Sequence, residues 1–338
     1  MKAYVVTAPH EGGVQDVPDA VAAEGEVVVD VHRVGVCGTD MEFWTGEMAY
    51  LHHGTSHYPM RLGHEWCGVV SSLGVGVDAS WLGRRVIGDT MIGCGHCHRC
   101  RSGRHHVCED RSELGVRGTF PGALAERLAV PASALVAVPD SVDDGAGAMV
   151  EPGGNALRAV WGAALSERDR VLVLGTGTMG LLAAEFARAA GVDVHLMGRS
   201  PEALEFTRGR GYAGTWLQSE LPALPWDAVI DASNAAALPA LALDLVEPGK
   251  RVVYLGLAGT PSLIDTRTMA LRDITAVGIL GASQALTGTI EHYARGSVDP
   301  RPLIAATVEL DRVGDVLSGW RPDTALAGPK IHIDPRLQ

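Results

Sequence analysis

The stretch Val171-Leu-Val-Leu-Gly175-Thr-Gly177-Thr-Met-Gly180 decides the fold of this chain. Its first residues are apolar and predict a buried strand, and the amphipathic run over residues 178–190 predicts a helix directly after the glycines. The pattern Gly-x-Gly-x-x-Gly is weak evidence on its own, since an ordinary glycine-rich turn can produce it. Between a strand and a helix, however, it is the fingerprint of a dinucleotide-binding unit.

Each position of this glycine loop has a physical reason in such a unit. Gly175 permits the tight turn, Gly177 lets the backbone approach a pyrophosphate, and Gly180 lets the helix pack closely on the strand. Thr178 and Met179 open the helix, whose unpaired N–H groups and positive dipole end attract phosphate. We therefore expect these five residues to bind a nicotinamide dinucleotide.

The end of the next strand selects the cofactor. An NAD-specific unit typically has Asp or Glu there, about 20 residues on, to accept a hydrogen bond from the ribose 2′-hydroxyl. This chain has Gly198 at that position, followed by Arg199 and Ser200. Arg199 can pair with a 2′-phosphate and Ser200 can donate to it, although Arg199 could also be a solvated loop residue. The sequence therefore favours NADP over NAD.

The fingerprint lies in a part of the chain where strands and helices alternate. Such alternation predicts right-handed βαβ units and a parallel sheet. The predicted helix is Asn155–Leu165, and the strands are Arg170–Leu174, Val192–Met197, Ala228–Asp231, Arg251–Leu255 and Ile274–Val277. We expect an α/β fold with a doubly wound Rossmann domain over residues 151–284.

The first 150 residues have a different pattern. Short valine-rich runs punctuated by Gly, Pro and Asp predict an all-β domain over residues 1–150. Its predicted strands are Glu26–Val31, Cys67–Val70, Arg85–Ile87, Ala125–Val130 and Leu135–Val138. A mixed tail over residues 285–338 follows the Rossmann domain, with a helix near Leu286–Ala294 and a strand near Lys330–Ile333.

Four cysteines lie close together in the sequence, at Cys94, Cys97, Cys100 and Cys108. Four thiols at this spacing can converge on one tetrahedral ion and fill every position, as in a structural zinc site. A disulfide framework is less favoured, because only six cysteines occur in 338 residues and neighbours three apart bridge poorly. A ferredoxin-type iron–sulfur run would place the fourth cysteine sooner, before a proline, but here Glu109 follows it. We predict a structural-zinc lobe over residues 93–109.

A second, open metal site is spread over distant segments. Cys37 in the sequence VCGTD supplies a thiol, and His64 in LGHE supplies an imidazole. A catalytic zinc takes about three protein ligands and keeps one position for water or substrate. Glu65 and Glu151 compete for the third place, and could alternate as substrate arrives. Thr39 follows Cys37 by two residues and is placed to pass a hydroxyl proton outward.

Other polar residues near these motifs keep two interpretations. Asp40 could orient the metal ligands or simply cap a turn. His52, His53 and His57 could contact substrate or assist proton release, although such histidines are more often exposed loop residues. The histidines within the cysteine lobe are not expected to be ligands, because four thiols are available.

Composition limits the possible functions. The chain allows two domains, and its 46% apolar and 20% charged residues are ordinary for globular proteins. The net charge of −12 argues against non-specific nucleic-acid binding. No apolar run reaches the ~18–20 residues of a membrane span, and the N-terminal MKAYVV predicts a strand, with no signal sequence. Metal-binding cysteines suit a reducing cytoplasm, so we expect a cytoplasmic protein with small-molecule partners and neither nucleic acid nor membrane.

Taken together, the motifs resemble those of the zinc-dependent medium-chain dehydrogenases/reductases, the alcohol and polyol dehydrogenase family. The resemblance spans essentially the full length and rests on CGTD, GHE, the four-cysteine lobe, the Glu-Pro pair at residues 151–152 and the GTGTMG loop. It implies a GroES-like catalytic domain interrupted by the Rossmann domain, with the tail returning to the first. It also implies catalytic and structural zinc, two ions per chain, and a homodimer or homotetramer.

Glu151 separates this chain from the simple alcohol dehydrogenases, which have cysteine at the corresponding position. Sorbitol- and threonine-dehydrogenase-like members have Glu-Pro there, so the resemblance implies polyol, sugar or amino-alcohol substrates. The stretches over residues 58–66 and 108–115 also resemble bacterial aminocyclitol dehydrogenases, such as the 2-deoxy-scyllo-inosamine dehydrogenases.

The expected function is therefore zinc-dependent hydride transfer between NADP(H) and a secondary alcohol or ketone of a polyol, sugar or aminocyclitol. The alternatives among enzymes are a simple alcohol dehydrogenase or carbonyl reductase, or a threonine-dehydrogenase-like enzyme. A non-catalytic zinc-bearing scaffold is the alternative from another class. Such a scaffold would keep the four-cysteine lobe and lose the open metal site. In this chain, however, all candidate ligands of the open metal site are present.

Overall fold

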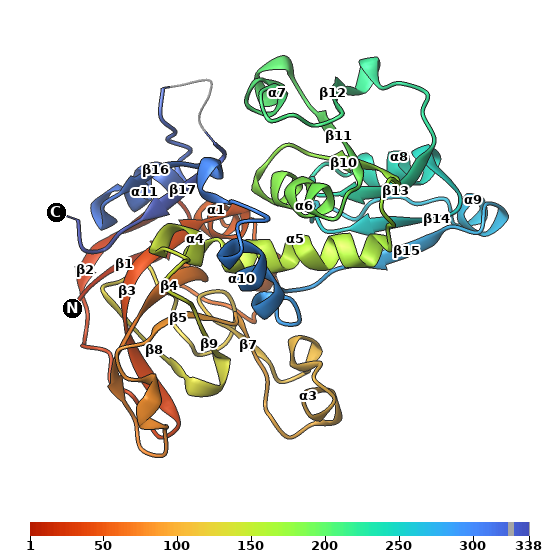
Figure 1. Cartoon of the computed structure of the whole chain (residues 1–338). Coiled ribbons are helices and arrows are strands. Elements are labelled where there is room, and N and C mark those ends of the chain that lie inside the picture. Colours follow the sequence, from red (N-terminus) through yellow and green to blue (C-terminus); the bar gives the residue numbers. More distant parts are fainter. Residues whose placement is uncertain (324–327, 338) are drawn as a thin grey trace. The chain divides into compact units, whose positions relative to one another are not determined.

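The computed structural model describes residues 1–323 and 328–337, which form two compact units. Unit 1 contains Met1–Glu151, Leu286–Pro322 and Lys330–Gln338, and unit 2 contains Pro152–Ala285 and Asp323–Pro329. The chain therefore leaves unit 1, forms unit 2 and returns to unit 1 (Figure 1). Residues 324–327 and 338, which the predicted tail includes, lie outside the described residues.

Unit 2 is built on a six-stranded parallel sheet, which confirms the predicted Rossmann-type α/β fold. The strand order is β12-β11-β10-β13-β14-β15, so the chain starts in the middle of the sheet and later reverses. Dinucleotides bind at such a switch point, here between β10 and β13. The strands are β10 (Arg170–Leu174), β11 (Asp193–Gly198), β12 (Gly214–Leu217), β13 (Trp226–Asp231), β14 (Val246–Tyr254) and β15 (Thr275–Gly278).

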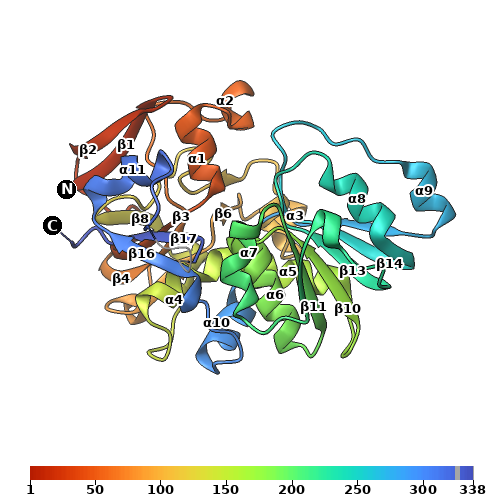
Figure 2. The same cartoon turned by 90° about the horizontal axis from the view of Figure 1, so that it is seen from above.

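Helices cover the strands of this sheet. Helix α6 (Thr178–Ala189) contacts β10 and β11, α7 (Pro201–Arg208) contacts β11 and β12, and α8 (Leu238–Leu245) contacts β13 and β14 (Figure 2). The central strand β10 is consequently almost completely buried, as expected for a parallel sheet with helices on its faces. The remaining helices are α5 (Val150–Ala163), which begins at the end of unit 1, and α9 (Thr266–Leu271).

Unit 1 is built on a seven-stranded sheet that the C-terminal segment completes. The strand order is β16-β17-β3-β4-β5-β9, and β8 also pairs with β3. Strand β17 pairs antiparallel with β3, so the end of the chain lies beside its beginning (Figure 1). The strands are β3 (Glu26–Val36), β4 (Glu65–Leu73), β5 (Arg85–Gly88), β8 (Arg127–Pro131), β9 (Leu135–Ala137), β16 (Ile304–Val308) and β17 (Lys330–Ile333). Two small sheets add β1 (Lys2–Ala8) with β2 (Glu11–Asp16), and β6 (Met91–Ile92) with β7 (Ser112–Glu113).

The prediction of an all-β arrangement for the first 150 residues is wrong in detail, because short helices interrupt it. They are α1 (Gly38–Thr45), α2 (Ala49–His52), α3 (His98–Arg101) and α4 (Asp144–Ala148), and the tail adds α10 (Leu286–Ala294) and α11 (Val313–Leu317). Helix α1 is held by its N-terminal cap and by burial of Phe43 and Trp44. Tertiary burial of this kind stabilises helices too short to be stable alone. No helix in the described part of the chain has the length and apolar character needed to cross a membrane.

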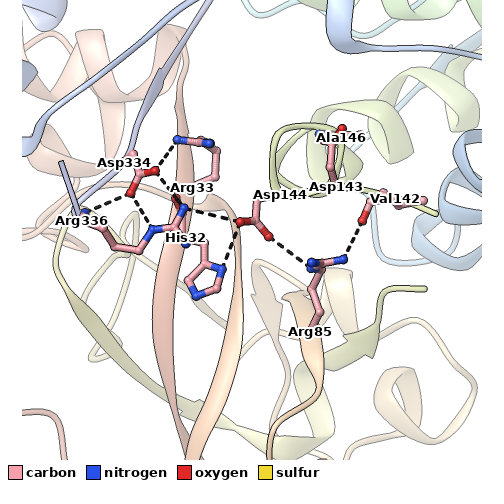
Figure 3. Close-up of polar contacts among 9 residues, drawn as sticks. All are labelled: His32, Arg33, Arg85, Val142, Asp143, Asp144, Ala146, Asp334 and Arg336. Carbon is pink, nitrogen blue, oxygen red and sulfur yellow. Dashed lines mark hydrogen bonds and ion pairs between the residues drawn. The ribbon is translucent and has the colours of Figure 1, made fainter. Parts of the chain in front are cut away.

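A polar cluster fastens the C-terminal segment to β3 and α4 (Figure 3). Arg33 donates to Asp334 at 2.6 Å and Arg336 donates to it at 2.8 Å. Asp144, in the first turn of α4, lies 3.1 Å from His32 Nδ1 and 3.5 Å from the Arg336 guanidinium. The His32 hydrogen bond lowers the pKa of Asp144. The cluster therefore connects the end of the chain to the element that leads into α5.

Candidate functional site

Cys37 lies where β3 ends and α1 begins. It is the N-cap of α1, and its backbone N–H donates to Asp40 Oδ2 at 2.9 Å. The other oxygen of Asp40 accepts from the Gly63 N–H at 3.2 Å. Because Gly63 directly precedes His64, the fully buried Asp40 joins the two segments that carry the candidate ligands. Asp40 thus caps a helix and also fixes the two motifs against each other.

His64 and Glu65 bring two further donor atoms to Cys37. His64 Nε2 lies 3.3 Å from Cys37 Sγ. Ligands on one tetrahedral zinc, with bonds of about 2.3 Å to sulfur and 2.0 Å to nitrogen, lie ~3.5 Å apart. One potential ligand atom from each of the three residues lies within 4.8 Å of the others. A thiol, an imidazole and a carboxylate in this arrangement fit a zinc ion that keeps one open position.

The charges around these residues favour a cation. Burial opposes a positive charge on His64, but Cys37, Asp40 and Glu151 together raise the pKa of His64 well above its usual range. Burial and the Asp40 carboxylate raise the pKa of the Cys37 thiol. A bound metal ion takes its ligands in their deprotonated forms and so replaces these protons. We therefore expect metal binding at this site to weaken as the pH falls.

The other predicted catalytic residues lie outside this group of three. Glu151 is buried near the start of α5 and contributes to the raised pKa of His64. Thr39 is half-buried in the first turn of α1. The remaining candidates are exposed side chains in or just after α2, namely His52, His53 and His57.

One charged residue of the site, Lys330, was not predicted from the sequence. Its Nζ donates to Glu65 Oε2 at 2.6 Å and to the Val36 carbonyl at 3.1 Å. The only signal in the sequence was a lysine within the short strand β17, Lys-Ile-His-Ile, because its partner Glu65 lies 265 residues away. The Lys330 and Glu65 side chains are 2% and 3% exposed, so this ion pair is almost completely buried.

The four cysteines of the predicted lobe lie together, and none forms a disulfide. The Sγ atoms of Cys97 and Cys108 are 3.8 Å apart, and those of Cys94 and Cys100 are 4.0 Å apart. Four sulfurs at about 2.3 Å from a tetrahedral zinc lie ~3.8 Å from one another. The observed separations therefore fit a closed four-thiolate zinc site.

Backbone donors and a neighbouring ion pair support this lobe. The Cys97 N–H lies 3.4 Å from Cys94 Sγ, and hydrogen bonds from the backbone at His96 and Cys97 lower the pKa of Cys94 to about 6. Such donors stabilise the thiolate, which is the form that binds metal. His105 Nε2 lies 2.7 Å from Asp89 Oδ2, so this histidine is engaged outside the thiol cluster.

The glycine loop of unit 2 has the geometry that close approach of a phosphate requires. Gly175 has a φ of 108°, which side chains rarely adopt, and a Cβ on Gly180 would lie 2.0 Å from the Gly175 carbonyl oxygen. Gly177 is the N-cap of α6, and a Cβ there would meet nothing within 4 Å. Thr178 and Met179 form the first turn of α6. The loop therefore leaves room for a pyrophosphate at the helix N-terminus.

Arg199 and Ser200 line a cavity of about 560 Å³ that follows the end of β11. The other lining residues come from the start of α7 and from the end of β12 and the turn after it, namely Pro201, Leu217, Gln218 and Ser219. Ser200 caps α7, since its Oγ accepts from the Ala203 N–H at 3.3 Å. Arg199 is exposed and has room for a charged ligand.

Comparisons with known proteins agree with this architecture. The model of the alcohol dehydrogenase GroES-like domain family matches residues 23–140. The L-threonine 3-dehydrogenase of Mesorhizobium japonicum is 30% identical over 325 residues, covering 92% of this chain and 93% of the relative. The starvation-sensing protein RspB of Escherichia coli K12 is 27% identical over 335 residues, covering 96% of each.

Solved structures match over nearly the whole chain. The alcohol dehydrogenase rspB of Escherichia coli CFT073, in complex with NADH, has a TM-score of 0.90 at 26% identity, with 99% of each chain covered. A Sinorhizobium meliloti dehydrogenase described as zinc-binding, bound to NADP, has a TM-score of 0.89 at 26% identity, also with 99% of each covered. The chain belongs to the family of zinc-dependent medium-chain alcohol and polyol dehydrogenases. It is an NAD(P)-dependent oxidoreductase that acts on small-molecule alcohols.

Proposed function

We propose that this enzyme transfers a hydride between NADP(H) and a secondary alcohol or ketone of a polyol, sugar or aminocyclitol. A zinc ion held by Cys37, His64 and Glu65 would be its catalytic metal, and a second zinc would fill the four-thiol lobe. The convergence of three different donor types within 4.8 Å carries this proposal. The alternative third ligand, Glu151, is outside that group, which is why we favour Glu65.

Residues of the chain have separate roles in proton transfer, in positioning the metal ligands and in binding the cofactor. The zinc, when bound, supplies a Lewis acid that favours loss of the substrate hydroxyl proton near neutral pH. Thr39 would accept that proton and pass it outward, while Asp40 holds the Cys37 and His64 segments in place. A bound nicotinamide cofactor would supply the hydride acceptor for oxidation of the carbinol carbon to a carbonyl carbon, and the hydride donor for the reverse reduction. The glycine loop would hold the cofactor pyrophosphate.

Arg199 supports the preference for NADP, and the preference is testable. Gly198 ends β11 without the carboxylate that would accept from a ribose 2′-hydroxyl, and Arg199 lines the adjacent cavity. We expect Arg199→Ala to raise the KM for NADPH about 10–100-fold and to leave the KM for NADH within about twofold, because one charge-assisted phosphate contact is lost. Initial rates with each cofactor measure both values.

Arg208→Ala is the matched control for this change. It removes an exposed arginine from the last turn of α7, the helix that begins just after Arg199. It should leave both KM values unchanged. Ser200 is a poorer target, since it also caps α7 and a bond from it lowers the pKa of Glu202. A wild-type enzyme that prefers NADH, or an Arg199 variant with unchanged NADPH affinity, would contradict the NADP assignment.

The substrate class is tested by nicotinamide absorbance with the zinc-loaded enzyme. Polyols and aminocyclitols are compared with threonine, simple alcohols and the matching ketones. Turnover of a polyol or aminocyclitol supports this substrate class, which rests on the Glu151-Pro152 pair. A threonine-dehydrogenase-like activity is the second candidate, because several curated relatives at 29–30% identity carry that name. Exclusive turnover of small alcohols would favour a simple alcohol dehydrogenase instead.

Strand β15 supports a homodimer. It is an edge strand of the parallel sheet, and three of its four residues are exposed. Leu271 before it is 75% exposed and Leu280 after it is 37% exposed. An exposed edge with apolar neighbours is a template for pairing with another chain, and a second copy offers the same edge. We expect a dimer, or a tetramer built from dimers, and a solution mass of 35.5 kDa would contradict this.

A cytoplasmic location is part of the same proposal. All six cysteines are free thiols, and the seven residues of the two candidate metal groups include five of them. Thiolate zinc sites of this kind suit a reducing compartment.

A further inference from the structure

The buried ion pair between Lys330 and Glu65 places a positive charge directly behind a candidate metal ligand. The Lys330 Nζ and Glu65 Oε2 atoms are 2.6 Å apart, and both side chains are at least 97% buried. A carboxylate has two oxygens that can accept, so the pair leaves Glu65 able to reach a metal ion with its other oxygen. Lys330 can therefore stay paired with one oxygen of Glu65 while the other oxygen binds the metal ion.

The backbone is built to hold this pair. Strand β3 lies between β17 and β4, with Val36 paired to Ile331 and Gly35 paired to Glu65. A Cβ on residue 35 would lie 2.2 Å from Glu65 Oε2, so only glycine leaves room for the carboxylate. The Val36 carbonyl gives Lys330 a second acceptor at 3.1 Å. Three strands thus fix the lysine relative to the ligand.

The sign of the charge determines what Lys330 does. Negative partners make a metal ligand more basic, whereas a positive charge beside a carboxylate makes it a weaker base and a weaker electron donor. Around the candidate site, Asp40, Glu65 and Glu151 are buried acids that would together hold a zinc ion tightly and reduce its acidity. Lys330 offsets one of these charges at Glu65.

We propose that Lys330 is a positioning residue that weakens the hold of Glu65 on the catalytic zinc, so that this ligand is exchangeable and the zinc stays a strong Lewis acid toward substrate. The inference rests on the proposed function and deepens it. It assigns the weakest of the three ligand bonds to Glu65, and it gives the C-terminal strand β17 a part in setting the reactivity of the metal.

The test is the rate at which zinc leaves the catalytic site of Lys330→Met and Lys330→Gln. We expect zinc release to a chromophoric chelator to slow about tenfold in both variants. We also expect kcat to fall about 10–100-fold, the usual range for partners of metal ligands, with a smaller change in KM. The Cys37→Ala variant should keep only the lobe zinc, so it gives the rate of zinc release from the lobe alone. Lys330→Arg keeps the charge and should restore both values.

A purely structural lysine gives the opposite result. If Lys330→Met and Lys330→Gln release zinc faster than the wild type, the lysine only holds the carboxylate in place and the proposal is overturned. Lys250→Met, which removes a lysine paired with Asp227 in unit 2, should change neither quantity. A wild-type enzyme without zinc at Cys37 would instead refute the proposed function itself.

A double variant keeps the test decisive if Lys330→Met alone fails to fold because it leaves Glu65 buried and unpaired. Glu65→Gln with Lys330→Met contains neither charge of the pair. Since Lys330 acts through the Glu65 carboxylate, this double variant should release zinc at the rate of Glu65→Gln alone. A difference of more than about threefold between these two would overturn the proposal.

Discussion

The Cys37→Ala variant is expected to lose at least about a thousandfold in kcat and one of two zinc ions per chain. Zinc contributes several kcal/mol to stabilising the reacting oxygen, and each 1.36 kcal/mol is a tenfold change in rate. Cys37 supplies one of three donors that lie within 4.8 Å, and His64 Nε2 is its neighbour at 3.3 Å. Without the thiolate, His64 and Glu65 cannot retain the ion. Metal analysis and initial rates measure the two losses.

The fold should survive this substitution. Cys37 is the N-cap of α1, but the helix is held mainly by Asp40, Phe43 and Trp44, which are buried. We expect a loss of about 1 kcal/mol in the free energy of unfolding, typical of a single substitution. Cys67→Ala is the matched control, because Cys67 is also a buried free cysteine but belongs to neither metal group. It should keep both zinc ions and most of the activity, and activity in zinc-depleted Cys37→Ala would refute the assignment.

Cys100→Ser is expected to have the largest effect on stability. The lobe has little apolar core of its own, and its four thiols lie close enough to share one ion. Loss of a structural metal is among the few single changes that cost more than about 4 kcal/mol. We expect one zinc ion to be lost, the melting temperature to fall, and proteolysis to begin within residues 93–109. Thermal melts, metal analysis and limited proteolysis measure these three results.

His98→Ala tests whether the effect is specific to the thiols. His98 is exposed in α3, directly between two of the cysteines, and lies outside the group of four. Its replacement should leave zinc content and melting temperature unchanged. Unchanged stability and zinc content in Cys100→Ser, or a loss in His98→Ala equal to that in Cys100→Ser, would contradict a structural four-thiol site.

The parts of the fold that sequence predicted are those with local signals. Strand β10, helix α10 and strand β17 have the predicted bounds, because apolar runs and periodicity mark them directly. The glycine loop was also predicted from a local signal, because its motif lies within ten consecutive residues. Helix α1 was missed, since its stability comes from Asp40 reaching Gly63 and from buried aromatic residues, and these contacts are not local.

The residues of the candidate site also divide into those with a local sequence signal and those without one. Cys37, His64 and Glu65 were chosen from two short motifs, and the structure brings their donor atoms together. Their roles as zinc ligands stay predictions, as does the choice between Glu65 and Glu151. Lys330 could not be predicted, because its partner is 265 residues away and only the pairing of β17 with β3 brings it there. A lysine in the predicted strand KIHI does not identify the residue with which it pairs.

Removing and restoring the catalytic zinc tests the central claim most directly. Wild-type enzyme should contain two zinc ions per chain, and a chelator should remove the ion at Cys37, His64 and Glu65 before the one held by four thiols. Turnover with NADP should disappear in proportion to that first ion and return when one equivalent of zinc is added. Full turnover with only the lobe zinc present would contradict the account.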